Sequence, residues 1–416
     1  MLFKLTLSSL YARFLTVSMT VCAISLSLML YLSVEKLRTS AYTSFTDTIS
    51  QTDLIVGSRT SSIQLLLYSV FRIGNATNNI TWESYKDIIN RDEIAWSVPI
   101  SLGDSHKGFR VMGTNIEFFE RYKYRGGQSL EIEEGSYFND LYDVVLGFGV
   151  AEKLGYKIDS PLIVSHGLQS FTDHDDQPFK VSGILAKTGT PVDNTVIVSL
   201  QAIEAIHVDW SSGTKIQGQE TPIDQIRKMD LSPKNITAAL VGVKSKLQVF
   251  KLQRWINEYP EEALSSILPG VALQELWRIV GIVENLLLGI SVVVIFTTLI
   301  GMAAIVFSSL NERRREMAIW RAMGAPPSII IGLLMIEAFI ISILSVIVST
   351  ILLFLLLYLL QPWIDNTYGI LVNIEMLSLG DIFIFILFIL AAMIVSLIPA
   401  IRAYWFSIND GMTIKI

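Results

Sequence analysis

The chain has 416 residues, of which 51% are hydrophobic and only 17% are charged. Roughly a quarter of the residues in soluble domains are charged, so this deficit indicates segments buried in lipid. The net charge of −6 argues against a nucleic-acid-binding protein, which would need basic patches. The single cysteine excludes a disulfide framework or a cysteine zinc site within one chain.

Four apolar stretches are long enough to cross a bilayer, which takes about 20 residues. After an N-terminal segment at 1–13, spans are predicted at 14–34, 285–310, 328–360 and 381–402. The first stretch is longer than the apolar core of a signal peptide, which has about 7–15 residues, and it lacks an A-x-A exit. We therefore expect it to remain as an anchor.

The distribution of positive charge predicts the orientation, because lysine and arginine are retained on the cytoplasmic side. Four arginines lie between the second and third spans, whereas the loop at 361–380 contains no lysine or arginine. The segment at 311–326, the N-terminus and the tail at 403–416 are therefore predicted to be cytoplasmic. The long segment at 35–284 is predicted to face outward.

The outward segment has helical flanks and a mixed interior. Apolar side chains recur at three- and four-residue steps on both flanks, at Val34, Leu37, Ala41, Phe45 and Ile49 and at Leu273, Leu276, Trp277, Val280 and Val283. Such stripes indicate helices that either extend the first two spans as a paired stalk, which we favour, or pack on the domain. Strands are predicted at 144–147, 179–185, 195–200 and 238–243, with a helix at 150–154.

The predicted fold class is thus an α-helical membrane protein with four transmembrane helices and a mixed α/β extracytoplasmic domain between helices 1 and 2. The strand order stays open. The apolar tract at 65–71 has two interpretations, a plain core segment or the lining of a lipid or acyl groove.

The sequence contains no G-x-x-x-x-G-K-[ST] phosphate-binding loop, no G-x-S-x-G and no H-E-x-x-H. The phosphate loop provides the backbone N–H groups and the lysine that hold ATP. We therefore predict a non-catalytic subunit and not an autonomous ATPase or hydrolase.

The segment at 311–326 is predicted to form a short helix with a charged end and an apolar face. Its defining side chains are Glu312, Arg313, Arg314, Arg315, Glu316, Ile319, Trp320, Arg321 and Gly324. Such a helix suits docking into a groove of a cytoplasmic partner, and it equally suits lying on anionic lipid. Composition alone does not separate these two interpretations.

The run NERRREMAIWRAMGA at 311–325 resembles the coupling helix of FtsX-like permeases, the group that includes MacB and the lipoprotein-releasing LolC and LolE. The matching residues are Asn311, Glu312, Arg313, Glu316, Arg321, Ala322, Gly324 and Ala325, whereas Met317 and Trp320 replace the usual Ile and Leu. The segments at 145–155, 181–185 and 399–403 resemble further motifs of the same family. The resemblance covers nearly the whole chain.

This resemblance implies the permease subunit of a mechanotransmission-type ABC transporter in the bacterial inner membrane, with a MacB-like periplasmic domain. MacB carries its ATPase at the N-terminus, whereas this chain starts almost directly with the first span, so a separate ATPase subunit is expected to bind ATP and Mg. A second permease, as homo- or heterodimer, and a periplasmic binding or lipoprotein partner are further expectations. The cargo stays open among lipoproteins, lipids, peptides and metal-related compounds.

Glu337 is predicted to lie inside the third span. Because a carboxylate in the membrane is costly, we expect Glu337 to face protein, the headgroups or a dimer seam.

Histidines and carboxylates of the outward segment are candidate metal ligands. The segments at 53–80, 101–110 and 188–195 resemble a proteobacterial subgroup whose genes accompany zinc-acquisition systems. All four histidines lie in the outward segment, and the candidate metal ligands are His166, His174, Asp175 and Asp176. We favour solvated histidines, with any metal held by a separate soluble protein and no cofactor in this chain. Zinc at these side chains is the alternative.

Two other functions compete with the transporter interpretation. One is an FtsX-like membrane regulator that activates a cell-wall hydrolase, although that branch has a much shorter outward domain. The other is an anchored periplasmic metal-binding protein or metalloenzyme built on the histidines.

Overall fold

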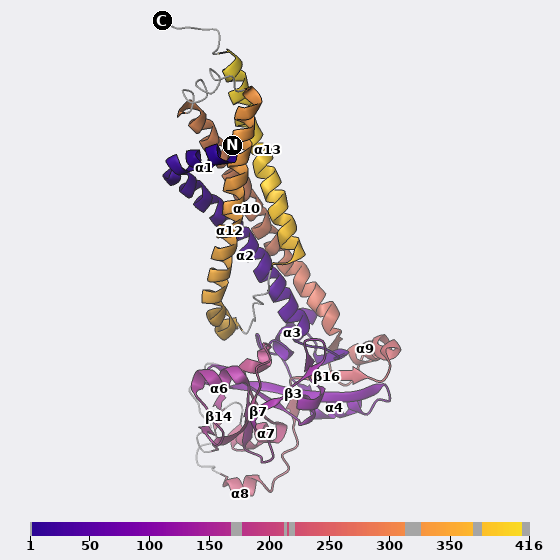
Figure 1. Ribbon diagram of the computed structural model, residues 1–416. Helices are drawn as coiled ribbons and strands as arrows, with labels where there is room; N and C mark the ends of the chain where they lie inside the picture. Colours follow the sequence, from indigo (N-terminus) through magenta and orange to yellow (C-terminus); the bar gives the residue numbers. More distant parts are fainter. Residues whose placement is uncertain are drawn as a thin grey trace. The chain divides into compact units, whose positions relative to one another are not determined.

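The computed structural model describes residues 2–167, 177–211, 214–215, 221–312, 326–368 and 377–409. The chain divides into two compact units. The membrane unit comprises Met1–Ser40, Gly281–Trp363 and Val372–Ile416, and the outer domain comprises Ala41–Val280 with Ile364–Leu371. Figure 1 colours the elements of both units by their position in the sequence.

Long helices form the membrane unit. They are α1 (Leu2–Ala12), α2 (Phe14–Asp47), α10 (Pro269–Glu312), α12 (Pro327–Tyr368) and α13 (Leu379–Asn409). Four segments in them are long and apolar enough to cross a membrane, with mean hydropathies from 2.0 to 3.0: Phe14–Thr43, Pro269–Phe307, Ile331–Trp363 and Leu379–Ile401. The predicted four-helix class is thereby confirmed.

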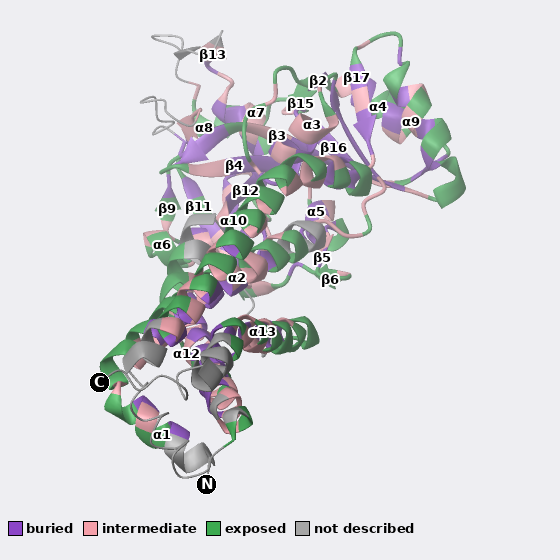
Figure 2. Cartoon of the chain, turned by 90° about the horizontal axis from the view of Figure 1, so that it is seen from above, coloured by how far each residue is buried: buried purple, intermediate pink, exposed green. Residues whose placement is uncertain are grey.

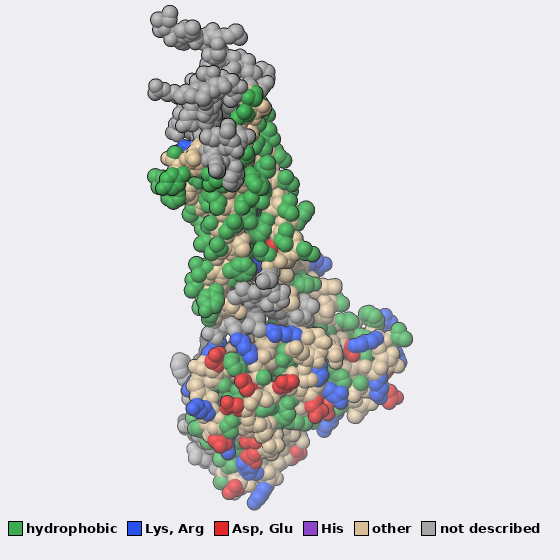
Figure 3. All heavy atoms as spheres, in the orientation of Figure 1, with side chains coloured by type: hydrophobic (Ala, Val, Ile, Leu, Met, Phe, Trp, Pro, Cys, Tyr) green, Lys and Arg blue, Asp and Glu red, His purple; other side chains and the backbone are tan. Residues whose placement is uncertain are grey.

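Most side chains on these helices face outward, since only 22–33% of the residues in the most apolar window of each span are buried. Figure 3 shows hydrophobic side chains covering the membrane helices, whereas acidic and basic side chains are scattered over the outer domain. The exposed apolar surface of the membrane unit is the kind that hydrocarbon covers.

A row of small residues lies on the buried side of α12. Ala338, Ser342, Ser345 and Ser349 follow one another at three- and four-residue steps, and all four are fully buried. The hydroxyls of Ser342 and Ser345 donate to the carbonyls of Ala338 and Ile341, at 2.6 and 2.8 Å. Small side chains whose polar groups are satisfied within their own helix let neighbouring helices approach closely in lipid.

The outer domain is built on an 11-stranded sheet with the order β17-β1-β16-β3-β4-β12-β8-β11-β7, with β10 paired to β3 and β9 to β11. Its strands are β1 (Leu54–Ser58), β3 (Ile94–His106), β4 (Phe109–Thr114), β7 (Ile132–Gly135), β8 (Asp143–Leu146), β9 (Pro161–Leu162), β10 (Ser165–His166), β11 (Phe179–Leu185), β12 (Thr195–Ser199), β16 (Ala238–Val243) and β17 (Leu264–Ile267). The pairs from β17 to β4 are antiparallel, and beyond β4 two parallel pairs (β4 with β12, β8 with β11) alternate with antiparallel ones.

Helices and two-residue strands complete the domain. The helices are α3 (Ser62–Ser69), α4 (Trp82–Ile89), α5 (Glu117–Arg121), α6 (Phe148–Leu154), α7 (Leu200–Ile206), α8 (Ile223–Ile226) and α9 (Val249–Asn257), with 3-10 turns η1 (Pro191–Asn194) and η2 (Lys246–Gln248). The short pairs are β2 (Ile80–Thr81) with β15 (Asn235–Ile236), β5 (Lys123–Tyr124) with β6 (Gln128–Ser129), and β13 (Trp210–Ser211) with β14 (Thr214–Lys215). Figure 2 shows buried residues gathered in the central strands of this domain.

Strand β3 joins the two halves of the sheet. Its first part pairs with β16 up to Ile100, and its second part pairs with β4 from Ser101, with a register shift between Leu102 and Ser105. The short strand β10 pairs with the end of β3, which places His166 opposite Asp104. A single 13-residue strand therefore positions side chains on both halves.

The predicted mixed α/β domain is confirmed, although three predicted segments have other bounds. The strand predicted at 144–147 is β8 at Asp143–Leu146, and the helix predicted at 150–154 begins at Phe148. The strand predicted at 195–200 ends at Ser199, because the Ser199 hydroxyl accepts from the backbone N–H of Ala202 at 3.1 Å and starts α7. The tract at 65–71 lies mainly in α3, where Leu65, Leu66 and Tyr68 are buried in the core beside β1. It is a core segment in this structure.

The apolar stripes on the flanks had two interpretations, helices that pair with each other and helices that pack on the domain, and α2 and α10 show both contacts. Ala272 and Leu273 are buried in the core of the outer domain, with Leu276 and Trp277 packed against it. The rings of Tyr42 on α2 and Trp277 on α10 lie 5.2 Å apart, so the two helices also touch each other. Pairing and packing on the domain therefore occur together.

Candidate functional site

An ion pair inside the membrane unit connects the junction of α1 and α2 with α12. Arg13, between α1 and α2, places its Nη2 2.6 Å from Oε1 of Glu337, and the Glu337 side chain is only 3% exposed. A buried carboxylate is tolerated in such surroundings when a cation compensates it. Glu337 therefore faces protein within its own chain.

A second ion pair, which the sequence analysis did not predict, connects α2 with α13. Lys36 Nζ lies 3.0 Å from Oδ2 of Asp381, which is buried near the start of α13. The same carboxylate accepts the backbone N–H of Ser378 at 2.8 Å, and the Asp381 N–H donates to the Ser378 hydroxyl at 3.1 Å. The sequence feature that could have suggested this pair is a charged residue at one end of each of the two spans, Lys36 after the first and Asp381 before the fourth.

Between these pairs, hydroxyl groups of α2 bond to two other spans. The Ser25 hydroxyl donates to the Ser345 carbonyl of α12 at 3.1 Å, and Ser27 shares a hydrogen bond of 2.8 Å with Thr298 of α10. Helix α2 is thus bonded to α10, α12 and α13.

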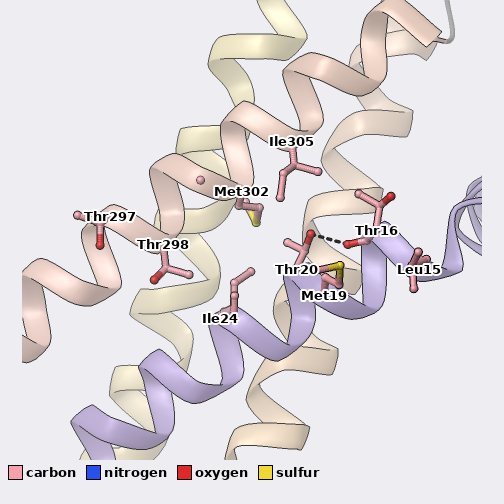
Figure 4. A pocket seen from close by; sticks show the side chains of 11 residues that line it. Leu15, Thr16, Met19, Thr20, Ile24, Thr297, Thr298, Met302 and Ile305 are labelled. Carbon is pink, nitrogen blue, oxygen red and sulfur yellow. Dashed lines mark hydrogen bonds between the residues drawn. The ribbon is translucent and has the colours of Figure 1, made fainter.

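A groove of about 410 Å³ lies between α2 and α10 (Figure 4). Leu15, Met19, Ile24, Met302 and Ile305 line it, with threonines on both sides. The hydroxyls of Thr20 and Thr298 have partners in the protein: Thr20 donates to the Thr16 carbonyl at 2.8 Å, and Thr298 donates to the Val294 carbonyl at 2.7 Å and shares the bond with Ser27. The groove therefore presents mainly hydrocarbon and suits an acyl chain or an apolar side chain better than a hydrophilic solute.

Most of the predicted ATPase-coupling residues lie outside the described residues. Glu312 is the last residue of α10. The remaining members of the set, Arg313, Arg314, Arg315, Glu316, Ile319, Trp320, Arg321 and Gly324, lie beyond the described part.

The metal candidates divide in a similar way. His174, Asp175 and Asp176 lie outside the described residues, whereas His166 is described on β10. His166 lies beside two groups that the sequence did not predict as its partners, Asp104 of β3 and His207 at the end of α7.

The three groups converge on one point. His166 Nδ1 lies 3.2 Å from Asp104 Oδ1 and 3.2 Å from His207 Nε2, and His207 Nε2 lies 3.7 Å from Asp104 Oδ1. Asp104 is 3% exposed at the base of the cluster, while His166 and His207 are 36% and 26% exposed at its rim. The hydrogen bond that Asp104 accepts from His166 raises the pKa of His166.

Local contacts fix the orientation of His207. Its Nδ1 lies 2.7 Å from the Ile203 carbonyl, which requires the proton on Nδ1 and leaves the lone pair on Nε2 in the neutral ring. Helix α7 can approach the sheet here because position 113 on β4 is glycine, and a Cβ there would lie 2.5 Å from Ile203 Cγ1.

His106 has a different, structural role. It is buried, its Nδ1 lies 2.5 Å from the Ile163 carbonyl, and its Nε2 lies 3.0 Å from the Tyr156 hydroxyl. These contacts hold the 156–163 segment against the end of β3.

Two family models match the chain. The MacB-like periplasmic core domain matches residues 14–248, and the FtsX-like permease C-terminal domain matches residues 288–408. An uncharacterized ABC transporter permease of Methanocaldococcus jannaschii is 23% identical over 221 residues, covering 53% of this chain and 49% of that protein. The match therefore spans about half the length of that relative.

Solved structures of two outer domains are also similar. The periplasmic region of MacB from Actinobacillus actinomycetemcomitans is 10% identical with a TM-score of 0.34, over 55% of this chain and 94% of that one. The extracellular domain of the noncanonic ABC-type transporter YknZ from Gram-positive bacteria is 15% identical with a TM-score of 0.30, over 52% of this chain and 99% of that one.

Proposed function

Because this chain belongs to the family of permeases that combine a MacB-like periplasmic core domain with an FtsX-like C-terminal domain, we propose that it transmits mechanical work from a cytoplasmic ATPase to its periplasmic domain. In this proposal it is the membrane-spanning subunit of an ABC transporter in the bacterial inner membrane. The proposal assigns the binding of ATP and Mg to a separate ATPase subunit, since such a site needs a phosphate-binding loop with its lysine.

The observation that carries the proposal is the continuity of α10. This helix has 44 residues, from Pro269 to Glu312, which gives it a length of roughly 66 Å. Its first turns contribute Ala272 and Leu273 to the core of the outer domain, and its last residue, Glu312, begins the charged coupling segment. In the proposal this one helix carries a displacement from the coupling segment towards the outer domain.

Helix α2 supports the same mechanism. It is a single helix of 34 residues whose polar contacts reach α10, α12 and α13. A push on the coupling segment would therefore move a connected set of helices. The proposed substrate is periplasmic and belongs to one of four classes: lipoproteins, lipids, peptides or metal-related compounds.

The coupling segment at 311–326 is proposed to dock into the ATPase, and a second permease to complete the complex. The test is to purify the full chain in detergent with its co-purifying ATPase and to measure ATP turnover. Ile319→Pro should lower the turnover at least about tenfold, because proline removes a helical hydrogen bond and bends the segment. Ile319→Ala, which keeps the helix, should retain most of it.

Charge reversal provides an independent variant. Glu312→Lys combined with Glu316→Lys should also uncouple turnover, whereas Glu133→Lys on the exposed face of β7 should not. All variants must be present in the membrane at equal levels. Normal ATP hydrolysis by both coupling variants, or a purified chain with no ATPase bound, would sink the proposal.

A further inference from the structure

We propose that Asp104, His166 and His207 form a binding site in the outer domain for a divalent transition-metal ion, with zinc as the ion that the ligand set suits best. The site lies where β10 pairs with the end of β3 and where α7 ends. It does not rest on the proposed transport function, since it concerns a cluster within the outer domain alone.

The spacing of the three ligand atoms matches one face of a tetrahedron around zinc. With bonds of about 2.0–2.1 Å, two ligands of a tetrahedral zinc ion lie about 3.3 Å apart. The separations among Asp104 Oδ1, His166 Nδ1 and His207 Nε2 are 3.2, 3.2 and 3.7 Å. An ion can therefore bind to all three atoms with shifts of only a few tenths of an ångström.

The chemistry of the ligands selects the class of ion. Calcium and magnesium prefer sets made of oxygen atoms, whereas two imidazoles with one carboxylate are typical of zinc and its first-row neighbours. The carboxylate of Asp104 is almost fully buried, and its ion-pair contacts among the described residues are to the two histidines. A dication at this point would compensate the buried negative charge.

The surrounding structure preorganises the ligands. The Ile203 carbonyl holds Nδ1 of His207, a second contact of the kind that orients metal-binding imidazoles. Backbone pairing between β3 and β10 fixes His166 opposite Asp104. The Trp210 ring lies 5.3 Å from the His166 ring and 6.0 Å from the His207 ring, beside the half-exposed rim.

The experiment uses the full chain, purified in detergent with an affinity tag that contains no histidine. Zinc is added, and bound zinc per chain is measured by equilibrium dialysis and elemental analysis. Wild type should bind one more equivalent than the double variant His166→Ala/His207→Ala, and Asp104→Asn should weaken binding at least about tenfold. The control Asp140→Asn removes an exposed carboxylate that pairs with Arg227 and should bind like wild type.

The melting temperature with and without zinc is a second measurement, which distinguishes loss of the site from poor folding of a variant. Zinc should raise the melting temperature of wild type and of Asp140→Asn but not of His207→Gln, which keeps the size of the side chain. Cobalt should give the absorption of a tetrahedral site in wild type and Asp140→Asn, and not in His207→Gln. Equal zinc binding by wild type and the double variant would overturn the proposal. So would metal-free wild type at saturating zinc, because the cluster would then be a hydrogen-bonded network and nothing more.

Discussion

Buried carboxylates in the outer domain are each held by partners from nearby or distant segments. Asp193 accepts hydrogen bonds from the backbone N–H groups of Thr188 and Gly189 at 2.9 and 2.7 Å and from the Thr188 hydroxyl at 2.7 Å. Burial nevertheless raises its pKa. Glu93 differs because its neighbours are cations, with Arg91 Nη2 at 3.0 Å and Lys251 Nζ of α9 at 3.3 Å.

The environment of Glu93 predicts a pH dependence of stability. The hydrogen bond from Arg91 is the largest of the causes that lower its pKa to about 2 from the ordinary 4.5. A carboxyl whose pKa is lower in the folded than in the unfolded state binds fewer protons when folded. Its contribution to the free energy of unfolding is therefore complete above about pH 4.5 and is lost as the pH falls towards 2.

Thermal unfolding of the full chain in detergent, measured at several pH values, checks this prediction. The melting temperature should fall between pH 4.5 and 2 less steeply in Glu93→Gln than in wild type. Glu133→Gln, an exposed carboxylate on β7, is the matched control and should follow wild type. Parallel curves for wild type and Glu93→Gln would contradict the assignment.

The histidine cluster was only partly predictable because its members are far apart in the sequence. His166 was predicted as a metal candidate together with neighbours at 174–176, because the sequence displays only what is near along the chain. Its partners in the structure are 62 and 41 residues away, on β3 and after α7. Strand pairing and helix packing bring them together, and no local pattern encodes either contact.

At the scale of elements, the strength of the local pattern decided what could be predicted. The strands at 179–185 and 238–243 were predicted at their observed bounds, since both are continuous β-rich runs between turn residues. Strand β3 contains Pro99 and Gly103 and mixes polar with apolar residues, and it was not predicted. The order of the strands depends on non-local pairing and could not be derived.

Helix α2 is held to its neighbours by ion pairs, and the pair with α12 can be tested directly. Arg13→Gln or Glu337→Gln leaves one buried charge without its partner, and each should lower the free energy of unfolding by about 3 kcal/mol. The double variant should lose less than the sum, with a coupling energy of at least about 1 kcal/mol. Unfolding in detergent by increasing sodium dodecyl sulfate measures all three.

The exposed pair Glu35–Arg38 on the same helix provides the control. Its atoms are 3.8 Å apart at positions i and i+3, and its side chains are 28% and 41% exposed. Glu35→Gln should therefore change the free energy by less than about 0.5 kcal/mol. Additive effects of Arg13→Gln and Glu337→Gln would mean that this contact does not hold α2 against α12.

At the scale of the whole molecule, the two family matches follow one another along the chain, and the MacB-like match takes in the first span as well as most of the outer domain. The MacB-like match ends at residue 248 and the FtsX-like match begins at 288, while α10 spans Pro269–Glu312. One helix thus runs from the core of the outer domain into the FtsX-like region. The proposed relay requires the outer domain and the coupling segment to lie on opposite sides of the membrane.

Thiol labelling tests this orientation. In a Cys22→Ser background, Leu247→Cys and Ile416→Cys each supply the only cysteine of the chain, and Leu247 is 92% exposed. Four arginines between the second and third spans should hold that segment in the cytoplasm, which puts the C-terminus there as well. A membrane-impermeant maleimide added to spheroplasts should therefore label Leu247→Cys, and it should label Ile416→Cys only after the membrane is opened. Labelling of Ile416→Cys in intact spheroplasts would place the tail outside, and the coupling segment could then not meet a cytoplasmic ATPase while the outer domain worked in the periplasm.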